Sequence, residues 1–366
     1  MIRKKLLFIL TLLLFLPVLF LFTFINFKED YITNEKLVDE NIKNTPSQEN
    51  KDTNSILKKI TLFSSRPSEN YIKTADNMLN DRYKILHYEP FHFQNGISWD
   101  KAPKIVENTR TYFRSLHAHF FLYDLIAAYN DLGDTKYIHK GYSIIENWLK
   151  GNSYVHSSNP LAWHDEGTAR RLVVWINFYH AAKDVLNDEE KKLILKGIHE
   201  HANLLASEDF HSSNTNHGMF QDQALLVYSD YFENLTYERL AQQRLKDYFD
   251  FIISPEGVHL EHSPAYHQVI ANSIKNRKEY YGYKDDGKAL DYYTKLYDKL
   301  AYYYTWVIKP DGKLPLIGDT FNENLPSKVL WKENGDYVYA RTGGVEGTKP
   351  AGHSAVFPEG GYAIFR

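Results

Sequence analysis

Residues 212–228 read SSNTNHGMFQDQALLVY, and this stretch decides how the middle of the chain folds. Its second half is apolar at helical spacing, whereas its first half gathers Asn214, Asn216 and His217 directly before the helix. One capping residue is enough to begin a helix, so the additional side chains need another explanation. Free backbone N–H groups and the macrodipole at a helix start favour an anion. Asn216 and His217 are therefore predicted to face a carboxylate, and Asn214 to cap the helix.

Helices are predicted on both sides of this stretch. Apolar residues recur at helical spacing within 111–134, where Gly133 would end the helix. Similar patterns cover about 135–150, 166–184, 188–207, 217–232, 236–252, 263–282 and 287–308. Sequential helices joined by short loops pack as antiparallel hairpins. After residue 310 the segments DYVYARTGG and GYAIFR are predicted to be short strands. The sequence thus predicts a mainly α-helical chain followed by the beginning of an antiparallel sheet.

The first 26 residues form a separate segment. Three basic residues at positions 3–5 precede an uncharged, mainly apolar run over 6–25, which has the length of about 20 residues that spans a bilayer. We expect an uncleaved transmembrane anchor with the main domain outside the cytoplasm. A cleaved signal peptide, and hence a secreted or periplasmic protein, is the alternative. Residues 27–60 are polar and poor in large apolar groups, and they are expected to form a linker.

Composition limits the classes of function. The 366 residues include 43 Lys and Arg against 46 Asp and Glu without a long basic tract, which argues against a dedicated nucleic-acid-binding protein. Cysteine is absent, which excludes disulfides and a lipid-modified cysteine. Aromatic residues make up 15% of the chain. This fraction suits a carbohydrate groove in which rings stack on sugars, although aromatic side chains are more often part of a core.

Two other stretches place polar residues at the start of a helix. They are WHDEGTARRLVVWINFY at 163–179 and EGVHLEHSPAYHQVI at 256–270. In the second, Ser263 is a natural N-cap and Pro264 suits the first helical position. Tyr266 and His267 are therefore predicted to lie in the first turn of that helix.

These stretches, in this order, resemble the heparinase II/III superfamily of polysaccharide lyases, which includes alginate-lyase-like relatives. The motifs are W-H-x(6)-R-x(3)-W at Trp163, His164, Arg171 and Trp175, N-x-N-H-G at 214–218, and G-V-H-x-E-x-S-P-x-Y-H at 257–267. IGDT at 317–320 and FPEGGYAIFR at 357–366 also look like family segments. The resemblance covers about residues 80–366. It implies an incomplete (α/α) toroid over 61–325 and the start of a β-sandwich domain over 326–366.

The resemblance implies cleavage by β-elimination at a uronic acid. Asn216 and His217 match the family positions that neutralise the substrate carboxylate, and Tyr266 matches the base that removes the C5 proton. Tyrosine ordinarily ionises near pH 10, so a neighbouring cation or donor has to stabilise the phenolate. The candidates for that role are Arg171, His267 and His217. The predicted substrate-binding residues are His164, Arg171, Glu261 and His267.

Structural interpretations stand beside these roles. Trp163 and Trp175 favour the core, and Arg171 is equally compatible with an internal ion pair to Asp165 or Glu166. The three histidines at 259, 262 and 267 have no established arrangement of metal ligands, so a hydrogen-bonding role is favoured and no metal or cofactor is predicted. The resemblance implies a further catalytic histidine, and in several members a zinc site, only in a complete β domain. The last ~35 residues are expected to form at most a small ribbon, and slow or undetectable turnover with retained polymer binding is expected of this form.

Two other classes of function remain open. A glycoside hydrolase needs two carboxylates that flank the scissile bond. The candidates are Asp165, Glu166, Glu261 and Asp319. A membrane-anchored polysaccharide-binding protein that serves the assembly of a surface polymer would bind without turnover. The predicted partners are an acidic polysaccharide and, through the N-terminal segment, a membrane. The uronic acid, its linkage and the oligomeric state stay open.

Overall fold

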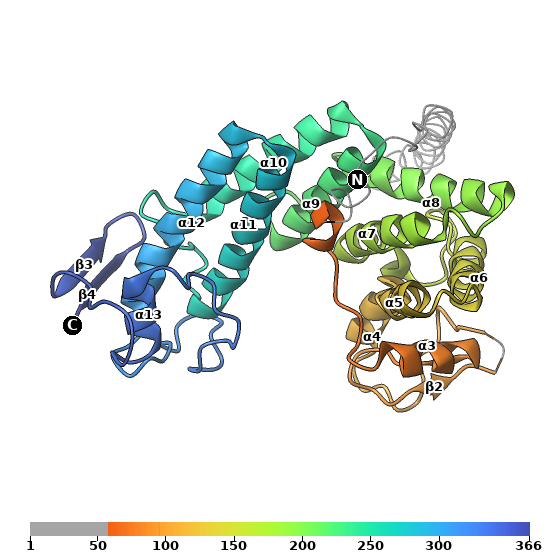
Figure 1. The fold of residues 1–366 in the computed structure, drawn as a ribbon, viewed down its shortest axis with the longest axis horizontal. Helices are drawn as coiled ribbons and strands as arrows, with labels where there is room; N and C mark the ends of the chain where they lie inside the picture. The colour runs from red at the N-terminus through yellow and green to blue at the C-terminus, as the bar shows by residue number, and fades with distance from the viewer. Residues whose placement is uncertain (1–57, 95) are drawn as a thin grey trace, which may run out of the picture. The chain divides into compact units, whose positions relative to one another are not determined.

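The computed structural model describes residues 58–94 and 96–366 (Figure 1). The expected anchor over 1–26 and nearly all of the expected linker over 27–60 lie outside these residues. None of the helices in the described part of the chain is long and apolar enough to cross a membrane. The described residues form two compact units, of which the first comprises 66–211 and the second combines 58–65 with 212–366. Most of both units is helical, as the sequence predicts.

The first unit is built from helices and one short antiparallel ribbon. Its elements are α3 (Tyr71–Leu79), β1 (Arg82–Tyr83), β2 (Phe91–His92), α4 (Thr109–His117), α5 (Leu122–Leu132), α6 (Lys136–Gly151), the 3-10 helix η2 (Pro160–Trp163), α7 (Asp165–Ala182) and α8 (Asp188–Ala206). Helix α5 packs on α3, α6 and α7, and α7 packs on α8. The predicted hairpin arrangement of sequential helices is therefore present.

The single helix predicted within 111–134 is two helices, α4 and α5. Between them His119 takes a positive φ of 60°, which interrupts the helical hydrogen bonds. Its ring is completely buried and accepts a hydrogen bond of 3.1 Å from the indole of Trp175. Packing of this side chain thus overrides the local helical pattern. The predicted end at Gly133 is confirmed, since this glycine has the left-handed conformation after α5.

The second unit contains four long helices. Its elements are α9 (Asn216–Phe232), α10 (Leu235–Ile252), α11 (Pro264–Lys284), α12 (Gly287–Val307), α13 (Gly335–Arg341), β3 (Ser354–Phe357) and β4 (Tyr362–Phe365). Helix α9 packs on α10 and α11 on α12, as Figure 1 shows. Strands β3 and β4 form an antiparallel ribbon in which Ser354 is opposite Phe365. The predicted strand in GYAIFR is confirmed, and the ribbon has two strands.

Two local predictions are wrong. The segment DYVYARTGG contains helix α13 rather than a strand, because Asn334 caps the helix by accepting a hydrogen bond of 3.0 Å from the Tyr337 N–H. The buried residues Tyr337 and Ala340 then lie three positions apart on one face. At the start of α9, the cap is Thr215 and not Asn214, since the Thr215 hydroxyl accepts from the Gly218 N–H at 3.1 Å.

Helices α9 and α11 run parallel in a constant register. Met219 Sδ lies 3.2 Å from Ser273 Oγ, Gln223 Oε1 lies 3.4 Å from Arg277 Nη2, and an Asp230 oxygen lies 3.6 Å from Lys284 Nζ. The partners in all three pairs are 54 residues apart in sequence. A constant separation along both helices requires that they lie side by side and point the same way. Helix α10 therefore returns the chain so that α9 and α11 begin at the same end of the second unit.

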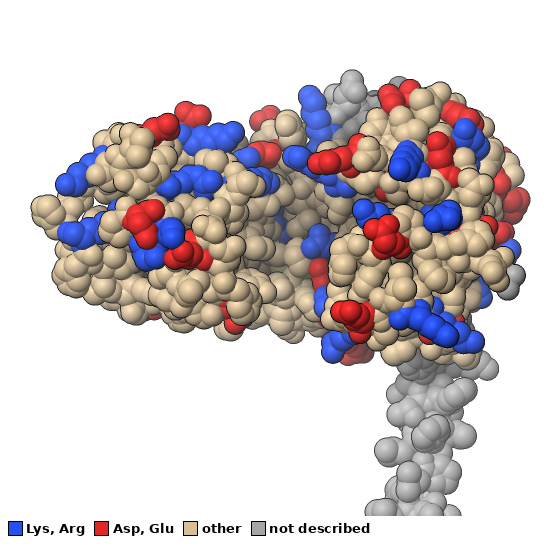
Figure 2. Space-filling view, turned by 90° about the horizontal axis from the view of Figure 1, so that it is seen from below, with Lys and Arg blue, Asp and Glu red and all other residues tan. Residues whose placement is uncertain are grey.

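Charged side chains on the described surface are mixed in sign. On the face drawn in Figure 2, lysine and arginine are interspersed with aspartate and glutamate. Many of them form pairs one helical turn apart, such as Lys295 with Asp291 and Lys275 with Glu279. Exposed pairs of this kind contribute little to stability. The charges on this face therefore mark no single region for binding an anion.

Candidate active site

The start of α11 presents Tyr266 to solvent. Ser263 caps the helix, with its hydroxyl 3.4 Å from the Tyr266 N–H, and Pro264 occupies the first helical position, as predicted. Ser263 is only 3% exposed, whereas Tyr266 is 37% exposed. The cap is thus fixed inside the protein while the phenol ring beside it remains accessible.

A loop over 317–320 holds this helix start in place. The Thr320 hydroxyl accepts a hydrogen bond from the Ala265 N–H at 3.1 Å and lies 3.1 Å from the Ser263 hydroxyl. Gly318 has a φ of 55°, and a Cβ atom there would lie 2.8 Å from the carbonyl oxygen of His262. Only glycine allows this close approach. No role was predicted for Thr320 from the sequence. Its place in the IGDT motif could have indicated that it contributes to the site.

The start of α9 exposes the predicted carboxylate-binding residues. Asn216 is the first residue of the helix and is exposed, and the following His217 is half-buried. The turn before them is fixed because the Ser212 N–H donates to Gln221 Oε1 at 2.7 Å and the Thr215 hydroxyl donates to the Ser212 carbonyl at 2.9 Å. Since Thr215 already caps the helix, Asn216 and His217 are not needed for capping.

The parallel register brings these residues to one end of the second unit. A separation of 54 residues places Asn216 of α9 level with Ile270 of α11. Tyr266 precedes Ile270 by four residues, so it lies about 6 Å closer to the N-terminal end of α11 along the helix axis. All three predicted catalytic residues therefore lie at the same end of one parallel helix pair.

The other members of the third motif divide into exposed and buried groups. Glu261 is exposed on the turn before α11. His267 is completely buried, its ring bonds to the Leu300 carbonyl at 3.0 Å, and it stacks on Tyr304 with 5.1 Å between ring centres. Burial lowers the pKa of His267 to about 3, so the ring is neutral at physiological pH. The location of His267 favours a structural role, while substrate contact by Glu261 stays a prediction.

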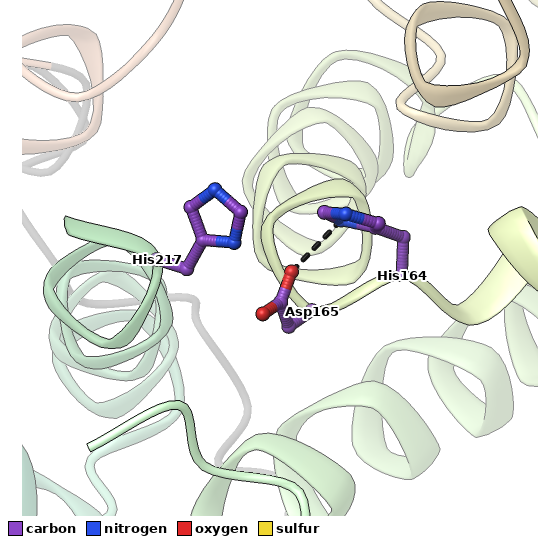
Figure 3. Close-up of side chains that lie close together, drawn as sticks. All are labelled: His164, Asp165 and His217. Carbon is purple, nitrogen blue, oxygen red and sulfur yellow. Dashed lines mark ion pairs between the residues drawn. The ribbon is translucent and has the colours of Figure 1, made fainter. Parts of the chain in front are cut away.

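In the first unit, His164 and Asp165 form a pair at the start of α7. His164 Nδ1 lies 2.8 Å from Asp165 Oδ1, which also accepts a hydrogen bond of 2.6 Å from the Glu166 N–H. Figure 3 draws this pair, and it also draws His217 on the first turn of α9. His164 is the N-cap residue of α7, and both side chains of the pair are partly exposed. A carboxylate beside an imidazole fixes the orientation of the ring.

Glu166 joins two arginines of the first unit. It forms ion pairs with Arg114 of α4 and, at 3.5 Å, with Arg170 one helical turn further along α7. These side chains are between 23% and 32% exposed. Glu166 is thus neutralised by Arg114 and Arg170. The sequence had offered an ion pair between Glu166 and Arg171 as an alternative.

Arg171 is enclosed in an aromatic cage. Its Nε donates to His201 Nε2 at 2.8 Å and its Nη1 donates to the His117 carbonyl at 2.6 Å. The guanidinium carbon lies 3.9 Å from the centre of the Trp148 ring and 5.1 Å from that of Trp163. Contacts between a cation and aromatic faces are stabilising when both are shielded from water.

The cage makes Arg171 part of the core. The side chain has no exposed area, and its Nη2 has no hydrogen-bond partner. Burial and the positive charge of Arg171 together lower the pKa of the neighbouring His117 to about 3. Trp163 and Trp175 are buried, as predicted. A substrate contact by Arg171 would require this cage to open.

Groups of the metal-ligand type are sparse within each unit. His164 and Asp165 supply two such groups in the first unit. Within either unit taken by itself, the described residues contain no cluster of three histidine, aspartate or glutamate side chains at ligand spacing. Two ligands alone do not define a zinc or calcium site.

Comparison with known proteins identifies the family. The profile of the heparinase II/III N-terminus matches residues 40–335, which is most of the chain. The chain belongs to the heparinase II/III family. The resemblance carried by the three polar stretches is thereby confirmed. A search of curated proteins found no match.

Solved structures of heparinases share the helical fold. A crystal structure of heparinase III has a TM-score of 0.60 at 19% identity, and the match covers 89% of this chain and 53% of that chain. Heparan sulfate lyase HepC from Pedobacter heparinus has a TM-score of 0.58 at 16% identity and covers 80% and 48% respectively. The heparinase III BT4657 gene product, with methylated lysines, has a TM-score of 0.58 at 18% identity and covers 86% and 52%. This heparinase II/III family member spans about half the length of these structures.

Proposed function

We propose that this chain is the helical part of a polysaccharide lyase that cleaves a uronic-acid-containing polymer by β-elimination. The observation that carries the proposal is the location of Asn216, His217 and Tyr266 at one end of the parallel pair α9 and α11. All three are solvent-accessible to some degree, although a helix start needs neither an additional imidazole nor an exposed phenol. Membership of the heparinase II/III family supports the same reaction class.

The residues divide the reaction between two tasks. The proton on C5 is hardly acidic because it lies next to a carboxylate, so donors must bind the charge that develops on the carboxylate oxygens. The Asn216 amide and the His217 imidazole supply these donors. The Tyr266 phenolate oxygen takes the C5 proton, the C5–H electron pair forms the C4–C5 double bond, and the bond from C4 to the glycosidic oxygen breaks with its electron pair on that oxygen. The leaving oxygen then takes a proton from the Tyr266 hydroxyl or from water, which gives the new hydroxyl end. The product carries an unsaturated uronic acid at its new non-reducing end.

The remaining site residues keep separate roles in this proposal. Glu261 and His164 are partly or fully exposed, and they are assigned to the substrate. Arg171 and His267 are enclosed, so their proposed contribution is to hold the elements on which the exposed residues stand. The helical segment over 61–325 is proposed to be an incomplete (α/α) toroid, and residues from 326 onwards to begin the family's sheet domain.

A glycoside hydrolase is the alternative enzyme. Its predicted carboxylates include Asp165 and Glu166, which are engaged by His164 and by Arg114 and Arg170. Glu261 and Asp319 are exposed and remain available. The lyase is favoured because the hydrolase leaves the cluster of Asn216, His217 and Tyr266 without a task.

Product chemistry tests the proposal. The purified protein is incubated with alginate, polygalacturonate and heparan sulfate, and ultraviolet absorbance and new reducing ends are measured together. A lyase produces both signals, whereas a hydrolase produces reducing ends without absorbance. Binding of polymer with neither signal, from the 366-residue form and from any longer form, would leave the chain as a non-catalytic binding protein. Any longer form of the chain is assayed beside the 366-residue form, because a β domain is proposed to add a further catalytic group.

The N-terminal segment is proposed to anchor the protein in a membrane with its main domain outside the cytoplasm. The basic residues at 3–5 and the uncharged run over 6–25 support this location. Membrane fractionation combined with protease accessibility tests it. A freely released protein that has lost its first residues would show that the segment is a signal peptide.

A further inference from the structure

The second unit contains a pocket that the proposed reaction does not use. The pocket has a volume of about 420 Å3 and lies between one face of α10 and the start of α12. Arg239, Gln243 and Lys246 line it from α10, and Lys288 and Tyr292 line it from α12. Its volume falls within the range of ligand sites in proteins.

Two cations of this pocket have no partner among the residues that the structure describes. Arg239 and Lys288 are exposed, and neither side chain forms an ion pair or a hydrogen bond within this described part of the chain. Neighbouring lysines of the same unit are neutralised, for example Lys284 by Glu238 and Lys295 by Asp291. The charge of Arg239 and Lys288 is therefore available to an anion.

The third cation is fixed in place beside an aromatic ring. Lys246 forms an ion pair with Asp250 and lies 5.7 Å from the centre of the Tyr292 ring. The Tyr292 hydroxyl donates to Asp250 at 2.9 Å, so both side chains are anchored by one carboxylate. The only carboxylate in the lining of the pocket is Asp286, which caps α12 by accepting from the Ala289 N–H at 3.1 Å. The described lining thus carries three cations and one anion.

The floor of the pocket is rigid and aromatic. Tyr281 and Tyr293 are buried and stack with 5.3 Å between ring centres and 8° between ring planes. Tyr292 is partly exposed at the wall. An aromatic wall offers an apolar face to the C–H groups of a sugar ring, while the amide of Gln243 and the three cations offer polar contacts at the rim.

This pocket is distant from the candidate catalytic residues. Tyr281 follows Tyr266 by 15 residues on the same helix, which corresponds to about 22 Å along the α11 axis. One sugar residue cannot contact both places. A polymer, in contrast, has further acidic residues that can reach a second site.

We propose that the pocket between α10 and α12 is a second, non-catalytic site that binds an acidic sugar residue of the polysaccharide. The ligand class rests on the proposed function, whereas the pocket and its unpaired cations do not. Arg239 and Lys288 bind the carboxylate or sulfate of the sugar, and Tyr292 packs against its ring. Because both sites lie on one unit, binding of the polysaccharide at the second site raises its effective concentration at the candidate catalytic residues.

The test compares long and short ligands in a variant of the pocket. The double substitution Arg239→Gln with Lys288→Gln removes two charges that have no partner among the described residues, so the melting temperature should stay unchanged. Binding of alginate, polygalacturonate and heparan sulfate is measured by calorimetry, with chains of more than 20 sugars and with tetrasaccharides. We expect affinity for the long chains of the polymer that binds to fall about tenfold, the scale of two surface charge contacts. Affinity for the tetrasaccharide at the catalytic end should stay unchanged.

A matched control separates the pocket from general charge. Lys275→Gln with Lys295→Gln also removes two positive charges from exposed helical surface of the same unit, outside the pocket. This control should keep its affinity for long chains. Equal losses in both double variants, or equal binding of the neutral polymer dextran by the wild-type protein, would overturn the second site.

The outcomes also distinguish this proposal from the proposed function. Loss of long-chain affinity in the pocket variant, together with no ultraviolet-absorbing ends from the 366-residue form or any longer form, would support the site and contradict the lyase. Normal elimination with unchanged long-chain affinity and KM in the pocket variant would support the lyase and overturn the site. Where both proposals hold, the KM for polymer rises about tenfold in the pocket variant while kcat stays at the wild-type value.

Discussion

Each unit buries one arginine completely, but the two units surround it with different side chains. Arg171 of the first unit lies among tryptophan rings and bonds to His201 and the His117 carbonyl. Arg277 of the second unit bonds to the Ser273 carbonyl at 2.9 Å and to Gln223 of α9 at 3.4 Å. Arg171 thus stabilises the core of the first unit. Arg277 instead joins α11 to α9, the two helices that begin at the candidate active site.

The aromatic side chains near the two buried arginines also differ between the units. The indoles of Trp148 and Trp175 donate to buried histidines at 3.0 and 3.1 Å, so they are part of the first unit's core. In the second unit, the guanidinium of Arg277 lies 5.1 Å from the Phe249 ring centre, and tyrosines dominate the packing around it. Tyr266, which is exposed, and Tyr292, which is partly exposed, belong to the same unit. In the proposed function the residues of the elimination stand in the second unit, whereas the first unit contributes the substrate contact of His164.

The largest expected effect concerns Tyr266. Tyr266→Phe should abolish elimination and leave the melting temperature within about a degree of wild type, because the hydroxyl is accessible and the substitution removes nothing else. Initial rates of absorbance change and thermal unfolding provide the measurement. Tyr302→Phe, which alters another exposed tyrosine of the second unit, serves as the control and should keep full activity. Turnover at the wild-type rate by Tyr266→Phe would show that Tyr266 is not the base.

The next effect concerns the start of α9. Asn216→Ala or His217→Ala should each lower kcat by about two orders of magnitude, the scale of a lost oxyanion donor, with little change in stability. Thr215→Ala should do the reverse, because it removes the observed cap and costs about 1 kcal/mol of unfolding free energy. If Asn216→Ala instead lowered the melting temperature and left kcat unchanged, Asn216 would be a structural residue of the helix.

The two buried arginines provide the third test. Arg171→Met and Arg277→Met should each lower the free energy of unfolding by about 3 kcal/mol, since each leaves buried hydrogen-bond partners unsatisfied. Only Arg277→Met should also lower the specific activity of the folded fraction, because Arg277 joins α11 to α9. Activity is measured at a temperature where both variants remain folded. An equal loss of specific activity in both would mean that the first unit also controls the site.

Most of the long helices and the cap of α11 were predictable because they depend on local sequence, whereas the cap of α9 was assigned to Asn214 and is Thr215. Apolar spacing located the long helices, and Ser263 followed by Pro264 located the start of α11. The strand assigned to DYVYARTGG was wrong because aromatic and β-branched residues also fit one face of a short helix when Asn334 provides a cap. Local pattern thus determines where a helix begins more reliably than it determines the type of a short element.

The tertiary relations were not visible in the sequence. The burial of Arg171 depends on three tryptophans from different elements, and a charged residue beside Asp165 and Glu166 gave no sign of that cage. The parallel register of α9 and α11 depends on the contact between Gln223 and Arg277, and the whole of α10 lies between these two residues in the sequence. Motif order indicated which residues belong to the site, whereas packing determines which of them reach solvent.

The smallest expected effect concerns acid stability and uses His259 of the second unit. Burial, reinforced by the neighbouring charge of His262, lowers the pKa of His259 to about 4. Neither ring nitrogen forms a hydrogen bond with any residue in the described ranges 58–94 and 96–366, so an apolar side chain of similar size loses no partner there. The folded pKa lies below the ordinary value of about 6.5, and the unfolded chain therefore binds the proton more readily between those values. The stability contributed by the neutral ring is complete above pH 6.5 and is lost as the pH falls toward 4.

The corresponding substitution is His259→Leu. Between pH 8 and pH 5 the wild-type protein should lose about 2 kcal/mol of unfolding free energy through His259, and the variant should be spared that loss. Urea denaturation at both pH values measures the difference, and His353→Leu at an exposed position should behave as wild type. Buried histidines of the first unit, such as His117, also have lowered pKa values and remain in the variant, so its acid sensitivity should decrease without disappearing. An unchanged pH dependence in His259→Leu would show that acid destabilises the protein through other buried histidines, such as His117 and His267, and not through His259.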